Sequence, residues 1–151
     1  MKRYAFVILV LFATLLAACA SSASQEAAPE AAPGLVISGG ETSKTYTRTD
    51  LEVLTTTQAT FKDVTYVGVT VSALLQDAGF NLDEVKAVKA VASDGYSVNY
   101  DTTQVLADDV IVAYATADGD LTADDGSFRM VLPGAEGKLN VRMLSELQII
   151  K

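Results

Sequence analysis

Residues 66–79, which read YVGVTVSALLQDAG, carry the signals of a strand, a helix cap, a short helix and a helix stop, in that order. The Tyr, Val and Thr residues before Thr70 favour an extended strand. The Thr70 hydroxyl can cap a helix over residues 71–78, and Gly79 can end it. This stretch therefore predicts a strand that runs directly into one short, buried helix.

The sequence on either side predicts further strands and few helices. A tight turn is expected at the Ser93-Asp94-Gly95 triplet, and Thr49 is a candidate cap for a short helix through Leu54. Together these patterns predict an α+β fold, mostly β, over residues 34–151. The predicted strands lie in residues 35–37, 55–69, 85–92, 96–100, 110–115, 128–132 and 147–150.

Composition excludes several kinds of chemistry. The 151 residues suffice for one domain of ordinary size and include no His, no Trp and a single Cys, Cys19. A Ser-His-Asp or Cys-His nucleophile system lacks its general base. A zinc site built from His or several Cys is excluded on the same count, as is an intrachain disulfide.

The N-terminus has the pattern of an export signal. Two basic residues at positions 2 and 3 precede a largely apolar run through residue 18, too short for a membrane-spanning helix. The run ends Leu-Ala-Ala-Cys19, which resembles the bacterial lipobox. We therefore expect a lipoprotein signal peptide over residues 1–18, a lipidated Cys19 and a location in the cell envelope. The alternative is an ordinary signal-peptidase site beside a chance cysteine.

Residues 19–33 are expected to form the lipidated end of a tether, because residues 20–33 contain only small residues, Pro, Glu and Gln. After cleavage the chain would carry nine basic and 19 acidic residues, a net charge of −10. Such a body should be repelled by nucleic acid and by anionic lipid, so contact with the membrane is expected through the anchor alone.

The acidic segment 118–126 partly matches a calcium-binding loop. Placing Asp118 and Gly119 at the fifth and sixth loop positions puts Tyr114 and Thr116 where carboxylate or amide ligands are needed. We therefore expect a polar loop between strands.

Five stretches in the right order resemble the sulfite-oxidase-type molybdopterin-binding domain. They are YVGVTVSALLQDAG at residues 66–79, ASDGY at 92–96, IVAYATADGD at 111–120, GSFRMVLPG at 126–134 and VRML at 141–144. The resemblance implies a mixed α+β domain whose family members hold a molybdenum pterin in a central cleft.

The same resemblance implies a metal-ligating cysteine in a segment that this chain fills with residues 55–63, TTTQATFKD, which contain no Cys. A threonine hydroxyl cannot replace a soft thiolate. Leu139 stands where the family tends to carry a lysine, and the family's histidine contacts are absent. We therefore expect no cofactor, with molybdopterin as the alternative, its phosphate held only if Arg129, Arg142 and Lys138 converge.

Four residues are candidates for lining the cleft: Arg129, Arg142, Asp94 and Tyr96. Arg129 could meet a ligand carboxylate or phosphate, or form a structural ion pair with Asp94 or Asp125, and Arg142 has a similar choice. For Asp94 and Tyr96 the alternative is a hairpin turn followed by a packing aromatic.

No catalytic residues and no metal ligands are predicted, since nothing in the spacing pairs two carboxylates as acid and base. The chain is expected to be a lipid-anchored binding or accessory domain, with a small ligand or an envelope protein as partner. The alternatives are a molybdopterin-binding oxidoreductase subunit and a purely structural surface domain.

Overall fold

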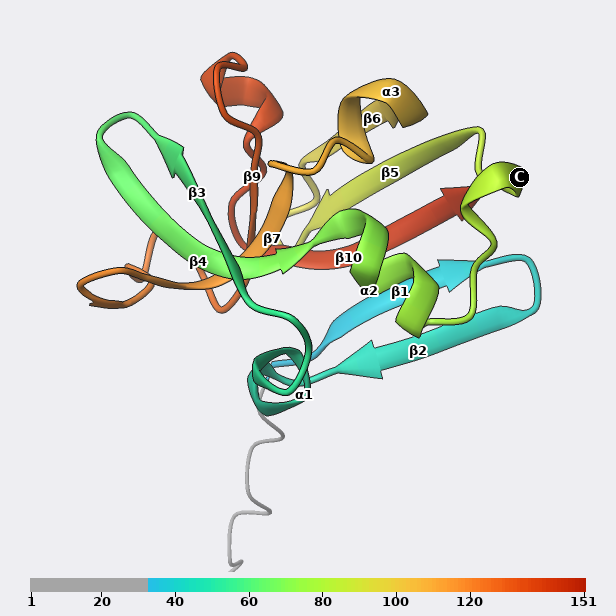
Figure 1. Cartoon of the computed structure of the whole chain (residues 1–151), viewed down its shortest axis with the longest axis horizontal. Coiled ribbons are helices and arrows are strands. Elements are labelled where there is room, and N and C mark those ends of the chain that lie inside the picture. The colour runs from blue at the N-terminus through green and yellow to red at the C-terminus, as the bar shows by residue number, and fades with distance from the viewer. Residues whose placement is uncertain (1–32) are drawn as a thin grey trace, which may run out of the picture. The chain divides into compact units, whose positions relative to one another are not determined.

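The computed structural model describes residues 33–151, in which two five-stranded sheets pack together with short helices at their edges (Figure 1). The first sheet has the order β2-β1-β10-β5-β6, and only its β1–β10 pair is parallel. The second sheet has the order β3-β4-β7-β8, with β9 also paired to β7. The strands are β1 (Leu35–Gly39), β2 (Thr42–Tyr46), β3 (Thr57–Phe61), β4 (Val64–Thr70), β5 (Ala87–Ala92), β6 (Ser97–Asp101), β7 (Ile111–Thr116), β8 (Gly119–Asp120), β9 (Arg129–Val131) and β10 (Leu144–Ile150).

The helical elements are short. They are α1 (Arg48–Glu52), α2 (Val71–Asp77), α3 (Thr102–Val105) and the 3-10 turns η1 (Leu82–Glu84) and η2 (Gly137–Leu139). The mostly β α+β fold predicted from the sequence is confirmed. So is α2: Thr70 Oγ1 accepts a hydrogen bond from Ala73 N, and both leucines of the helix are fully buried.

Three details of the sequence prediction were wrong. The cap of α1 is Thr47, not Thr49, because Thr47 and Asp50 form a reciprocal capping box. Residues 55–69 are not one strand but the β3–β4 hairpin, whose turn places Lys62 and Asp63 at positive φ. The short polar strand β2 was not predicted, because its stability comes from pairing with β1 rather than from an apolar face.

Both faces of β7, in the second sheet, are buried, and they contact two apolar clusters. Val112 and Tyr114 of β7 face the main core between the sheets. Ile111 and Ala113 of the same strand face a smaller cluster with Ala59, Tyr66 and Val131. The smaller cluster forms the floor of the region described below.

Gly68 permits β4 and β7 to pair closely. A Cβ at this position would overlap the Val112 carbonyl oxygen and lie 2.7 Å from Ala113 Cα, both backbone atoms that cannot move aside. The register of the two strands also shifts between Val67 and Gly68. Only glycine fits this bulge without moving the sheet.

Residues 1–32, which hold the predicted signal peptide, Cys19 and nearly all of the predicted tether, lie outside the described residues. Within residues 33–151, no helix has the length and apolar character needed to cross a membrane.

Candidate functional site

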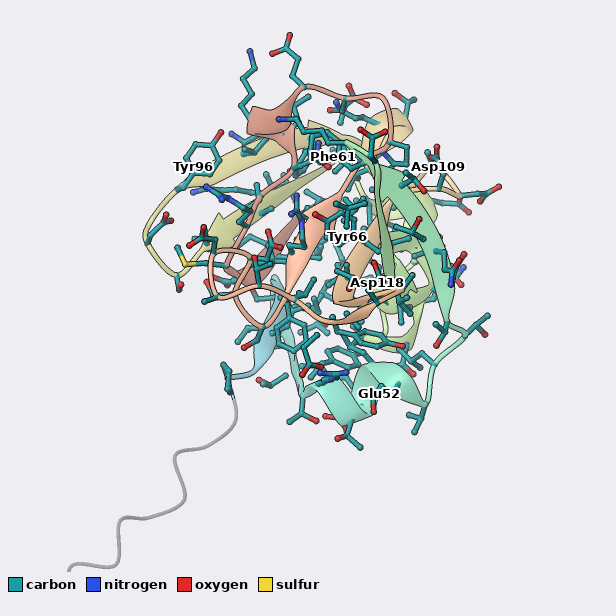
Figure 2. The ribbon with its side chains drawn as sticks, turned by 90° about the vertical axis from the view of Figure 1, so that its left-hand side faces the viewer. Glu52, Phe61, Tyr66, Tyr96, Asp109 and Asp118 are labelled. Carbon is teal, nitrogen blue, oxygen red and sulfur yellow. The ribbon has the colours of Figure 1, made fainter. Side chains whose placement is uncertain are left out.

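The first candidate site is a cavity of about 450 Å³ over the smaller apolar cluster, which we call the arginine cavity. The β3–β4 hairpin forms one wall, and the segment leading from η2 to β10 forms the other. Figure 2 shows Tyr66 near the centre of this region with Phe61 above it. The lining residues are Phe61, Lys62, Val64, Tyr66, Asp125, Arg129, Gly137, Asn140 and Arg142.

A neighbouring cavity of about 300 Å³, which we call the tyrosine cavity, shares Gly137, Asn140 and Arg142 with the first. Tyr96, at the upper left of Figure 2, belongs to its lining. The complete lining is Asp94, Tyr96, Gly137, Lys138, Asn140, Val141, Arg142 and Met143.

Arg129 forms a buried ion pair in the wall of the arginine cavity. Its Nη1 donates to Asp125 Oδ1 at 2.6 Å and to Tyr66 Oη at 2.8 Å, and its guanidinium lies 4.4 Å from the centre of the Tyr66 ring. The two charged side chains are only 6% and 9% exposed. Thr122 Oγ1 donates to the other Asp125 oxygen at 2.9 Å. Of the two ion-pair partners considered from the sequence, Asp125 is therefore the one that Arg129 uses.

The Nε atom of Arg129 is left without a hydrogen bond. It is buried and has no partner among residues 33–151. A buried N–H without an acceptor is costly, so this atom adds to the free-energy cost of burying Arg129.

Arg142 and Lys62 supply the accessible positive charge. Both border the arginine cavity, and neither takes part in any of the salt bridges among residues 33–151. Lys138, by contrast, pairs with Glu136 at 2.7 Å, which raises the Lys138 pKa through that hydrogen bond. Four of the domain's nine basic residues thus border the two cavities.

The wall between the two cavities is held by several hydrogen bonds. Tyr96 Oη donates to the Lys138 carbonyl at 2.8 Å, and Tyr100 Oη donates to the Leu139 carbonyl at 2.6 Å. Burial raises the pKa of Tyr100 well above its ordinary value, so it stays a donor. The Asn140 side chain spans the loop, accepting from Leu132 N at 2.7 Å and donating to the Glu136 carbonyl at 3.2 Å.

The backbone next to Arg142 is also constrained. Met143 has φ 48°, an uncommon value for a residue with a side chain. Its N–H donates to the Asp125 carbonyl at 2.7 Å, and its carbonyl accepts from Ser93 N at 2.8 Å. Asp125 therefore holds Arg129 through its carboxylate and the segment carrying Arg142 through its main chain.

The structure brings the four predicted site residues to two adjoining cavities. Arg129 and Arg142 line the first, and Asp94, Tyr96 and Arg142 line the second. Asp94 Oδ1 also accepts from Tyr96 N at 2.9 Å, as a turn residue would. Tyr114, which the calcium-loop alignment would place at a ligand position, is buried in β7. The segment 118–126 is not the uninterrupted loop that was expected, because Gly119–Asp120 form β8 against β7 and Asp125 is buried against Arg129.

Lys62, Phe61 and Tyr66 were not singled out from the sequence. Phe61 and Tyr66 were indistinguishable from strand residues that pack in a core. Lys62 was placed inside a strand predicted over residues 55–69, and nothing local indicates a turn there that reaches Gly137.

Comparison with known proteins places the domain in a family. Residues 34–151 match the family model described as the oxidoreductase molybdopterin binding domain. Among solved structures, the sulfane dehydrogenase SoxCD from Paracoccus pantotrophus is similar, with 25% identity and a TM-score of 0.66. The similarity covers 77% of this chain but 37% of that chain, so this chain spans little more than a third of the SoxCD chain's length. The comparison with curated proteins gave no match.

The family model covers the whole of the domain predicted from the sequence, and the similar structure reproduces its two-sheet fold. The resemblance seen in the five sequence stretches is thereby confirmed, and this chain belongs to the oxidoreductase molybdopterin-binding domain family.

Proposed function

We propose that this chain is an exported, lipid-anchored binding domain of that family, which holds a small anionic ligand and carries out no redox chemistry. The proposal rests on two features of residues 34–151 taken together. Four basic residues border two adjoining cavities, while this part of the sequence contains neither Cys nor His.

The donor set does not fit a thiolate-ligated molybdenum centre. The segment expected to supply the thiolate forms β3 and its turn, and the side chains that it contributes to the lining of the arginine cavity are the Phe61 ring and the Lys62 ammonium group. Neither side chain offers a thiolate. Cys19 is separated from the domain by the tether and is expected to carry lipid.

The cationic rim supports binding of an anion. The mature chain has an expected net charge of −10, so a local excess of positive charge is a specific feature rather than a property of the whole surface. Arg142 and Lys62 can form charge-assisted hydrogen bonds with a carboxylate, sulfate or phosphate group. The wall held by Tyr96, Tyr100 and Asn140 would keep the cavity shaped before a ligand arrives.

The anchor follows from the sequence pattern at Cys19. Multiple acyl chains would hold the protein on a membrane far better than one chain could. Replacing Cys19 with Ser should abolish labelling by radioactive fatty acid and leave a precursor or a soluble form. Fatty acid on the mutant would contradict this part of the proposal.

The second candidate is a molybdopterin-binding oxidoreductase subunit. Family membership favours it. The cofactor, when bound, would supply a molybdenum centre, and Arg142 and Lys62 would hold its phosphate.

Elemental analysis and the visible absorption spectrum of the full chain, purified from a pterin-replete host, separate these candidates. We expect no stoichiometric molybdenum. Near-equimolar molybdenum would overturn the non-redox proposal, whereas pterin without metal would support binding without the chemistry.

A further inference from the structure

We infer that Asp125 sets the charge selectivity of the arginine cavity, so that the cavity prefers a singly charged ligand to a doubly charged one. This inference rests on the proposed function and names the class of anion that the same site takes. It assigns to Asp125 the role of a built-in counter-ion for Arg129.

The deepest part of the cavity carries almost no net charge. Arg129 is its most buried cation, and its charge is balanced by Asp125 at 2.6 Å, with both side chains almost completely buried. A ligand charge placed beside this pair would meet no net positive charge and would lose its water. The family's phosphate-bearing cofactor is poorly suited to this part of the site.

The groups that remain available at depth suit an uncharged, flat portion of a ligand. The Phe61 and Tyr66 rings offer apolar surfaces. The centre of each ring lies within 6 Å of Arg129 Cζ.

The rim, by contrast, carries net positive charge. Arg142 is exposed and Lys62 lies at the hairpin turn, and the salt bridges among residues 33–151 include neither of them. A ligand that places one anionic group at the rim and an uncharged, flat portion against the Phe61 and Tyr66 rings therefore complements the cavity. The ligand class that fits is a small, planar molecule carrying a single negative charge.

The test uses sulfate and methyl sulfate, which share a tetrahedral oxyanion but differ by one charge. Each is titrated against the purified full chain, with nuclear magnetic resonance shifts of cavity residues as the readout. Wild type should bind methyl sulfate at least as tightly as sulfate. The D125N variant should shift the preference toward sulfate by about tenfold, since it leaves Arg129 uncompensated.

D124N is the matched control, because it removes the same charge from the exposed neighbouring residue. Its preference should stay within about twofold of wild type, as expected for a screened surface charge. If Asp125 had only a structural role, D125N would lower stability without changing the ratio of the dissociation constants for sulfate and methyl sulfate. A folded D125N with the wild-type ratio would therefore overturn the inference, as would a wild type that prefers sulfate by tenfold or more.

If D125N does not fold, the double variant D125N/R129Q answers the same question, because it removes both charges and keeps polar groups in place. It should retain the wild-type ratio, and a change of more than about threefold would overturn the inference. R142Q tests the proposed function separately, since it should weaken both anions. Binding of neither anion, or binding unaffected by R142Q, would refute the proposed function itself.

Discussion

Two clusters in this domain are built from the same three groups: a cation, a carboxylate and a tyrosine. In the arginine cavity they are Arg129, Asp125 and Tyr66, and the ion pair spans 2.6 Å. Between β2 and the end of α2 they are Lys44, Asp77 and Tyr46, again with a 2.6 Å ion pair and a 2.6 Å bond from the tyrosine. In both clusters the cation also lies over the tyrosine ring.

Exposure separates the two clusters. The charged side chains are 6% and 9% exposed in the first and 46% and 35% exposed in the second. Water can solvate the partner left behind when the exposed pair is broken, but not when the buried pair is broken. Equal distances therefore do not imply equal energies.

The largest expected difference comes from removing each carboxylate. Asp125→Ala should lower the free energy of unfolding by about 3–5 kcal/mol, because Arg129 is left charged and buried. Asp77→Ala should cause a much smaller loss, since Lys44 regains its hydration. Urea denaturation of both variants at one pH and salt concentration makes the comparison. Equal losses would show that exposure does not distinguish the clusters.

Removing each tyrosine hydroxyl should have a smaller effect. Tyr66→Phe deprives a buried Arg129 N–H of its acceptor and should cost about 1–3 kcal/mol. Tyr46→Phe should cost less, because Asp77 keeps its bond to Lys44 and can bind water. Denaturation midpoints test this order. A larger loss for Tyr46→Phe would reverse it.

Alkaline pH should act on the exposed cluster through its tyrosine. Burial, followed by the hydrogen bond to Asp77, raises the pKa of Tyr46 to about 12 from 10.0. The folded state therefore disfavours the ionised phenol. The stability from this group is fully present below pH 10 and is lost as the pH rises toward 12. Tyr46→Phe should reduce the loss of unfolding free energy between pH 10 and pH 12. An unchanged loss would show that Tyr46 is not its source.

The smallest expected effect is that of salt. Raising the ionic strength should weaken the exposed Lys44–Asp77 pair and leave the buried Arg129–Asp125 pair nearly unchanged. Double-mutant cycles on each pair, at low and high sodium chloride, measure both interaction energies. A coupling energy for the buried pair that falls with salt as steeply as the exposed one would indicate that water reaches Arg129.

The local elements were predictable where a few neighbouring residues decide them. Thr70 caps α2, and the Ser93–Gly95 turn connects β5 to β6, because a hydroxyl acceptor and a glycine at positive φ act within a few residues. Strand β2 was missed because it carries no apolar alternation, and its pairing with β1 supplies its hydrogen bonds. The error in the cap of α1 has a different origin, because both Thr47 and Thr49 are possible caps and the reciprocal bonds between Thr47 and Asp50 decide between them.

The candidate site was predictable only in part. Its residue types were visible, and the family resemblance indicated Arg129, Arg142, Asp94 and Tyr96, all of which line the two cavities. The contributions of Lys62, Phe61 and Tyr66 depend on the hairpin reaching the segment before β10, more than 60 residues away in the chain. No local pattern encodes that distance.

The sequence by itself determined the mostly β α+β fold, the family and the lack of a thiol in the domain, because these follow from residue types, their order and their spacing. Only the tertiary structure decided which carboxylate Arg129 meets and which of the basic side chains remain available to a ligand. The physical reason is that an ion pair depends on burial and on a distance of a few ångströms. Both are set by how the two sheets and their loops pack together.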